Sequence, residues 1–163
     1  GGQGAFNFVC QGFLHQDTVR FGGIFVNEDI QQGILFALNK GRIHRDMTAT
    51  DVRQQGRFED SIGIFPEFLD GYGILILPTT GRYFHLPYRT LLPQGVENLL
   101  VAGRITGGDR DSHAATRNMM CCAVTGQGAG AAAAISIKDA KAPSALSISR
   151  LQDELKRQSA RIH

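Results

Sequence analysis

The spacing of apolar residues predicts four short strands between residues 62 and 102. The runs at 74–77 and 99–102 contain no polar residue, which is typical of strands that are buried on both faces. A third strand is predicted at 83–86, where a proline ends the run, and a fourth at 62–65, inside a loop that extends from 57 to 70. We therefore expect the strands at 74–77 and 99–102 to be buried.

A helical spacing of apolar residues predicts two longer helices. Residues 28–39 place their apolar side chains on one face, with Asn27 as N-cap and Gly41 as C-cap, and they follow a predicted strand at 19–26. Residues 112–138 are expected to be mainly helical. The second half of this helix consists almost entirely of glycine and alanine.

Two further segments are short or irregular. Residues 1–18 are rich in glycine and carry no periodic pattern, so we expect an irregular edge there. Thr48-Ala49-Thr50-Asp51 has the pattern of a capping box, which predicts a short helical turn.

A linker and a final helix are predicted at the C-terminal side. The linker covers residues 140–147, and an amphipathic helix is expected to open at Ser149. Gln152 occupies the capping-box position of this helix, and Leu151 and Leu155 fall on its buried side.

The glycine-rich stretch 126–131 formally matches the dinucleotide-binding fingerprint. That motif requires a preceding strand and an acidic residue about 20 positions further on, whereas residues 119–125 continue a helical pattern. The alternative is a packing role, because Gly126, Gly130 and Ala134 repeat every four residues and would form one smooth helix face. We favour this packing role, since close approach of a neighbour would offset the cost of interior glycine, about 1 kcal/mol each.

The composition excludes classes of protein and adds no site. With 42% apolar and 20% charged residues, the 163-residue chain is expected to form one globular domain with at most an appendage. A formal net charge of +2 without long basic runs argues against nucleic acid or a membrane as partner, and no apolar run approaches a membrane span. The three cysteines and five scattered histidines suggest neither a disulfide framework nor a metal site, so the cytoplasm is the expected compartment. Adjacent Cys121 and Cys122 are expected to fill small core spaces.

The candidate chemistry follows the strand at 99–102. There the chain reads glycine, arginine, two further glycines and Asp109 before the next helix begins, an order that α/β proteins use to hold charged ligands. Asp109 is either a carboxylate that accepts hydrogen bonds from sugar or ribityl hydroxyls, or a helix cap. Asp111 and Ser112 are alternative caps.

Basic residues surround this carboxylate. His113 and Arg117 are four positions apart and so share one helix face, where they would attract a phosphate, a carboxylate or a developing anion. The alternatives are a solvated first turn or an ion pair with Asp109. Arg104 would pair with a phosphate or with Asp109, and Arg89 would face the same crevice or form a structural salt bridge.

Several stretches, taken in order, resemble the C-terminal portion of the FAD-dependent oxidoreductases of glutathione-reductase-like architecture. These stretches are 48–52, 57–63, 86–93, 96–104, 113–117 and 126–130. The final helix at 151–156 also resembles the tail of that family, so the resemblance covers roughly residues 48–160.

The resemblance implies an α/β fold, namely a partial FAD-binding, Rossmann-like fold with FAD as its cofactor. In such folds the acidic residue after the last strand contacts the ribityl or phosphate part, and here that residue is Asp109. Residues 112–117 would aim at the isoalloxazine ring and stabilise negative charge on the reduced flavin. The implied cofactor-binding residues are Arg104, Gly108, Asp109, Ser112, Thr116 and Arg117. The implied catalytic residues are His113, which would assist proton transfer, and Arg117.

The resemblance also implies a division of the chain. Residues 1–47 would be a remnant of the substrate or cap region, 48–140 the C-terminal part of the FAD-binding domain, and 141–163 a linker and amphipathic helix. The N-terminal ADP-binding βαβ unit of the family has no counterpart in this sequence, so a separate N-terminal FAD-binding half is an expected partner.

Two functions remain open at this point. The first is a C-terminal fragment of a flavin-dependent oxidoreductase that transfers hydride between an unknown small-molecule substrate and FAD. The second is a non-catalytic α+β module that keeps only the packing core of the family and binds a partner or an anionic ligand.

Overall fold

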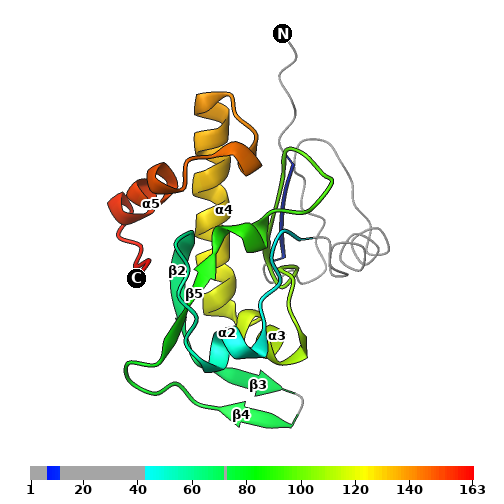
Figure 1. Ribbon diagram of the computed structural model, residues 1–163, viewed down its shortest axis with the longest axis vertical. Helices are drawn as coiled ribbons and strands as arrows, with labels where there is room; N and C mark the ends of the chain where they lie inside the picture. Colours follow the sequence, from blue (N-terminus) through cyan, green and yellow to red (C-terminus); the bar gives the residue numbers. More distant parts are fainter. Residues whose placement is uncertain (1–6, 12–42, 72) are drawn as a thin grey trace.

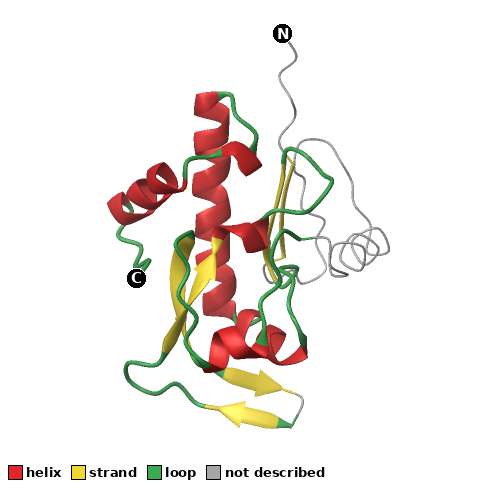
Figure 2. Ribbon diagram, in the orientation of Figure 1, coloured by secondary structure: helices red, strands yellow, loops and turns green. Residues whose placement is uncertain are grey.

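The computed structural model describes residues 7–11, 43–71 and 73–163, which form a mixed α/β structure built around one long helix (Figures 1 and 2). This helix, α4 (Met119–Asp139), contacts strands on two sides and a second helix on a third. The predicted strand at 19–26 and helix at 28–39, with their caps Asn27 and Gly41, lie outside the described residues.

A parallel pair of strands packs on one side of α4. It consists of β1 (Asn7–Gln11) and β6 (Leu99–Gly103), aligned from Asn7 opposite Leu99 to Gln11 opposite Gly103. The strand predicted at 99–102 is confirmed, and Leu100, Val101 and Ala102 are completely buried. The irregular edge predicted for residues 1–18 is wrong at 7–11, because the partner that stabilises this strand lies more than 90 residues away in the sequence.

An antiparallel pair packs on the other side of α4. It consists of β2 (Ser61–Pro66) and β5 (Tyr83–Pro87), in agreement with the strands predicted at 62–65 and 83–86. The 3-10 helix η1 (Tyr88–Leu91) follows β5 directly.

A third pair of strands forms a hairpin at one end of the molecule (Figure 1). It is made of β3 (Leu69–Gly71), which lies within the segment predicted as loop, and β4 (Ile74–Ile76). The strand predicted at 74–77 is thus present, but the prediction that it is buried is wrong, since Leu75 and Leu77 are each 64% exposed. In the described part of the chain β4 pairs only with β3, so its apolar composition does not reflect burial.

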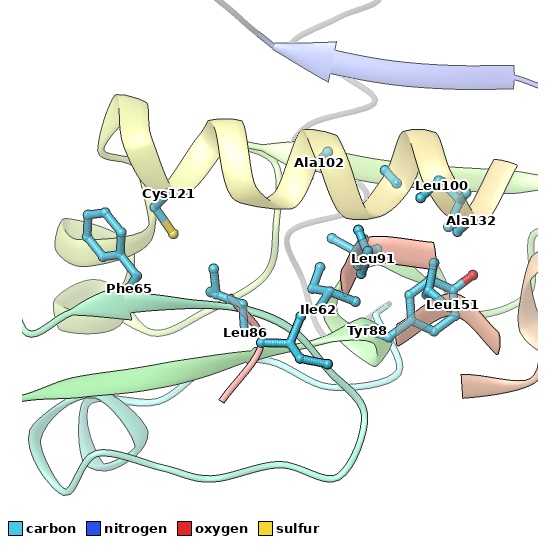
Figure 3. Packing of buried hydrophobic residues seen from close by; sticks show 14 of the residues in the cluster. Ile62, Phe65, Leu86, Tyr88, Leu91, Leu100, Ala102, Cys121, Ala132 and Leu151 are labelled. Atoms are coloured by element: carbon cyan, nitrogen blue, oxygen red, sulfur yellow. The ribbon is translucent and has the colours of Figure 1, made fainter. Parts of the chain in front are cut away.

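The hydrophobic core lies between α4 and the two larger pairs of strands (Figure 3). Burial of each large apolar side chain contributes roughly 1.5–3 kcal/mol. Among the largest buried side chains of the described residues, Tyr88 alone carries a hydroxyl group. This hydroxyl donates to the carbonyl of Pro143 at 2.9 Å. The side chains labelled in Figure 3 are Ile62, Phe65, Leu86, Tyr88, Leu91, Leu100, Ala102, Cys121, Ala132 and Leu151.

The close approach of α4 to β2 depends on two glycines. A Cβ on Gly128 would lie 2.6 Å from Cδ1 of Ile62, and a Cβ on Gly63 would overlap Cγ1 of Val124. The predicted packing face of Gly126, Gly130 and Ala134 is wrong, because Gly130 and Ala134 are exposed and a Cβ on Gly130 would meet nothing within 4 Å. Residues 121, 125, 128, 132 and 135 form the buried face instead, so glycine is needed at 128.

In the described part of the chain, two short α-helices precede α4. The first, α2 (Ala49–Arg53), has the predicted capping box between Thr48 and Asp51. The helix predicted at 112–138 is in fact two, α3 (Arg110–Thr116) and α4. Asn118 separates them because its side-chain amide donates to two carbonyls at the end of α3, while its extended backbone starts α4.

The C-terminal segment closes one side of the core. The predicted linker contains the 3-10 helix η2 (Pro143–Ala145), and the final helix is α5 (Ile148–Arg157), in which Leu151 and Leu155 are buried as predicted. Its N-cap is Ser147, two residues before the predicted start. Gln152 does not complete a capping box, because its amide donates to the carbonyls of Glu59 and Ser61 at 2.7 and 3.0 Å.

By length and composition alone, α4 could cross a bilayer, which contradicts the expectation that no segment approaches a span. The helix has 21 residues, and a window of 18 of them reaches a mean hydropathy of 1.4. One of its faces forms part of the protein core, and core helices of globular proteins pass the same test.

Candidate functional site

The carboxyl end of β6 turns sharply at Gly103. Its φ of 75° lies in the left-handed region, where glycine is favoured. Its N–H donates to the hydroxyl of Thr125 on α4 at 2.9 Å, and its carbonyl accepts from the hydroxyl of Thr106 at 2.9 Å. The turn that follows β6 is therefore fixed to α4 from its first residue.

Asp109 joins two helices at the end of this turn. One carboxylate oxygen accepts the N–H of Ser112 at 2.8 Å and caps α3, and the other accepts the N–H of Ala49 at 2.7 Å at the start of α2. Burial raises the pKa of Asp109, but these hydrogen bonds outweigh it and leave the pKa below its usual value. The side chain is exposed, and each oxygen retains a lone pair that a ligand hydroxyl can use.

The two glycines before Asp109 are required by the packing of the protein itself. A Cβ on Gly107 would overlap the carboxylate of Asp46, and a Cβ on Gly108 would lie 2.6 Å from the hydroxyl of Ser112. Gly108 also forms a parallel bridge with Met47. Gly108 thus shapes the turn through these protein contacts.

Ser112 and Thr116 lie on the buried side of α3. The Ser112 hydroxyl donates to the carbonyl of Met47 at 2.8 Å, so its role in the structure is to hold the chain before α2. Thr116 is 2% exposed, and its hydroxyl has no hydrogen-bond partner among the described residues.

Three basic residues of the predicted site lie together. Nε of Arg104 donates to the carbonyl of Arg117 at 3.3 Å, and Nε2 of His113 lies 3.3 Å from the carbonyl of Arg104. The guanidinium of Arg117 donates to the carbonyl of Asp70 in β3. We call Arg104, His113 and Arg117 the basic triad.

The triad contacts main-chain carbonyls and no carboxylate within the described residues. The alternative ion pair with Asp109 is not formed among the described residues; each oxygen of that carboxylate accepts a backbone N–H instead. The positive charge is therefore available to an anion.

Arg89 belongs to a different part of the molecule. It forms a bidentate pair with Asp60, with N–O distances of 2.9 and 3.0 Å. Asp60 is only 7% exposed, and hydrogen bonding to it raises the pKa of Arg89. The structural alternative stated for Arg89 is the one observed.

Sequence reasoning missed the contribution of the segment just before α2. Met47 accepts the N–H of Asp109 at 3.0 Å, and Asp46 places a buried carboxylate oxygen without a hydrogen-bond partner beside Gly107. The capping box at 48–51 marks a helix start, but nothing in its sequence indicates that it faces a turn 60 residues later.

The adjacent cysteines lie in the first turn of α4. Cys121 is completely buried, and burial raises the pKa of its thiol, as expected for a residue that fills core space. The sulfur of Cys122 lies 3.6 Å from the carbonyl of Arg117. Among the described residues, no three His, Cys, Asp or Glu side chains gather as metal ligands would.

Comparison with known protein families gives one match. A family model described as FAD dependent oxidoreductase matches residues 42–155, which is most of the chain. The chain belongs to this family. Membership of the FAD-dependent oxidoreductases implies FAD as the cofactor and confirms the family resemblance of the sequence motifs. Neither the curated proteins nor the solved structures gave a match.

The residues at the end of β6 suit part of an FAD molecule. Asp109 supplies an exposed acceptor for hydroxyl groups, and the basic triad supplies positive charge that forms no ion pair with a carboxylate of the described residues. Two buried oxygens without a hydrogen-bond partner in the described residues lie nearby. They are Oδ1 of Asp46, beside Gly107 in the turn, and the hydroxyl of Thr116 in α3.

Proposed function

We propose that this chain is the C-terminal portion of a flavin-dependent oxidoreductase of glutathione-reductase-like architecture. Its substrate would be a small molecule. The observation that carries the proposal is the convergence of an exposed carboxylate and the basic triad at the carboxyl end of β6, in a chain of the FAD-dependent oxidoreductase family. A Rossmann-like arrangement around β6 is part of the proposal.

Each residue of the site has a distinct role under this proposal. FAD, when bound, would accept hydride from the substrate at N5. Arg117, fixed to β3, would hold positive charge near the anion that develops, and His113 would move a proton to or from the substrate. Asp109 would accept ribityl hydroxyls, and Arg104 would bind phosphate or pyrophosphate.

The buried residues of the predicted site would act through shape. Gly108 and Ser112 keep the turn and the chain before α2 in place, and Thr116 offers a buried hydroxyl beside Arg117. We propose the same division of the chain as before, with 1–47, 48–140 and 141–163 as its parts.

The proposed partner is an N-terminal FAD-binding half. Two features support it. Helix α4 carries exposed apolar side chains at both ends, Met119 and Met120 at its start and Ile137 near its end, each at least 65% exposed, and a parallel pair of strands such as β1 and β6 is normally part of a larger, buried sheet. A matching half would cover these side chains and extend the sheet.

The alternative is a non-catalytic module, favoured by the use of both Asp109 oxygens in helix capping. A visible absorption and fluorescence titration of the purified chain with FAD separates the two. The oxidoreductase predicts a shifted flavin spectrum and saturable binding that weakens in Arg104→Gln. The exposed variant Lys141→Gln serves as control. A spectrum that stays that of free FAD at all concentrations would overturn flavin binding by this chain.

A further inference from the structure

A second group of basic side chains surrounds Tyr83, on β5. The guanidinium carbon of Arg57 lies 3.9 Å from the centroid of the Tyr83 ring, and that of Arg161 lies 5.7 Å from it. The ring of His85 stacks beside Tyr83 at 6.3 Å, and His163 lies 5.7 Å from His85. We call these five residues the Tyr83 cluster.

The cluster is held in place from both sides. His85 is 6% exposed, and the N–H of Phe58 lies 3.2 Å from its Nδ1. The C-terminal segment that carries Arg161 and His163 is anchored by Ile162, whose side chain is buried and whose carbonyl accepts from the Ser61 hydroxyl at 2.7 Å. The two exposed guanidinium groups therefore stand on a fixed base.

No side-chain carboxylate of the described residues forms an ion pair with Arg57 or Arg161. Other arginines near the cluster are paired with carboxylates, Arg45 with Asp51, Arg82 with Glu67 and Arg89 with Asp60. Within the described part of the chain, Arg57 contacts the Tyr83 ring, and Arg161 contacts that ring and, through Nε, the backbone oxygen of His163.

The positive charge of the cluster also acts on the pKa of His85. Burial lowers the pKa of His85, the Phe58 carbonyl partly opposes this, and the charges of Arg57 and His163 lower it further. No carboxylate acts on His85 from β5, from the segment before β2 or from the C-terminal segment.

We propose that the Tyr83 cluster is a binding site for a phosphate group. Two exposed guanidinium groups at one aromatic ring offer N–H donors to the oxygens of a dianion. The cluster shares no residue with the basic triad, so the inference does not depend on the proposed flavin chemistry.

The experiment is a phosphate titration of the whole chain followed by histidine ring NMR, with chloride added to keep the ionic strength constant. Assignment uses His85→Gln. We expect saturable shifts at His85 and a rise of its pKa when phosphate is bound. Arg57→Gln and Arg161→Gln should each weaken binding about tenfold, as for the loss of one charge-assisted hydrogen bond. Arg57→Lys should weaken it less, and Lys141→Gln should leave it unchanged.

Two further titrations, with glycerol 3-phosphate and with FAD, identify which kind of molecule supplies the phosphate group. Tighter binding of glycerol 3-phosphate than of inorganic phosphate would assign the site to a phosphorylated small molecule, and equal binding would assign it to the free ion. Displacement of phosphate by FAD would overturn a site separate from the cofactor. Shifts that rise linearly without saturation, or that persist in Arg57→Gln and Arg161→Gln, would overturn the proposal itself.

Discussion

Asp109 combines a structural role that the structure shows with the ligand role that we propose for it. Its two hydrogen bonds connect the starts of α2 and α3. We expect Asp109→Ala to lower the free energy of unfolding by about 1–2 kcal/mol for the lost caps. Urea unfolding measures this effect, and FAD titration of the same variant measures the ligand role independently.

Asp109→Asn is the matched control, because its amide oxygen can still cap α3 while the charge is lost. If both variants are as stable as the wild type, the capping contacts contribute nothing measurable. If both unfold earlier but bind FAD with wild-type affinity, the ligand role of Asp109 is wrong.

His85 makes the stability of the protein depend on pH. Because its pKa is lowered in the folded state, the unfolded chain binds an extra proton below about pH 6.5. The contribution of the neutral ring is thus complete above pH 6.5 and is lost as the pH falls toward the lowered pKa. We expect Tm to decrease from pH 7.5 to 5.5 in the wild type and to decrease less in His85→Gln.

Thermal unfolding at several pH values tests this prediction. His44→Gln changes an exposed histidine and should keep the slope of the wild type. Equal slopes in the wild type and His85→Gln would contradict a contribution from His85.

Among the elements, α4 and β2 fit together through reciprocal glycines. Gly63 leaves room for Val124, and Gly128 leaves room for Ile62. We expect Gly63→Ala to destabilise the fold by roughly 1–3 kcal/mol through overpacking. Because the clash is with one side chain, adding Val124→Ala should restore part of the loss in a double-mutant cycle.

Gly130 provides the control on the same helix. Its surroundings are open, so Gly130→Ala should raise the free energy of unfolding by up to about 1 kcal/mol through helix propensity. A destabilised Gly130→Ala would show that something covers this face in solution.

The β3–β4 hairpin is tied to α3 by Arg117. The guanidinium donates to the carbonyl of Asp70 and lies against Gly71. We expect Arg117→Ala to increase proteolytic cleavage and hydrogen exchange in 69–76, whereas Arg104→Ala should not. An unchanged hairpin in Arg117→Ala would mean that packing of β3 on α3 suffices to hold it.

At the scale of the whole molecule, local sequence patterns predicted where helices and strands occur, but they predicted less well which strands pair and which side chains are buried. The strands around Phe84 and Val101 and the capping box at Thr48 were readable because each signal lies within a few residues. The strand β1 was missed because its pairing partner is distant, and the exposure of Leu75 was missed because apolar runs do not reveal how many strands lie beside them.

The candidate site shows the same division. The sequence brought Asp109, His113 and Arg117 to attention through spacing alone, and Arg104 lies with two of them. It gave no sign of Asp46 and Met47, because contact between the chain before α2 and the turn after β6 is a property of the tertiary fold.

The reciprocal glycines also restrict how this protein can move. Sliding α4 along β2 by one residue would bring Val124 away from Gly63 and onto a side chain, so helix and strand behave as one rigid body. Thr125 extends that body to the end of β6 through its bond to Gly103. We therefore expect a conformational change on ligand binding in α3 and the hairpin, which residues 117 and 118 separate from α4, rather than between α4 and β2.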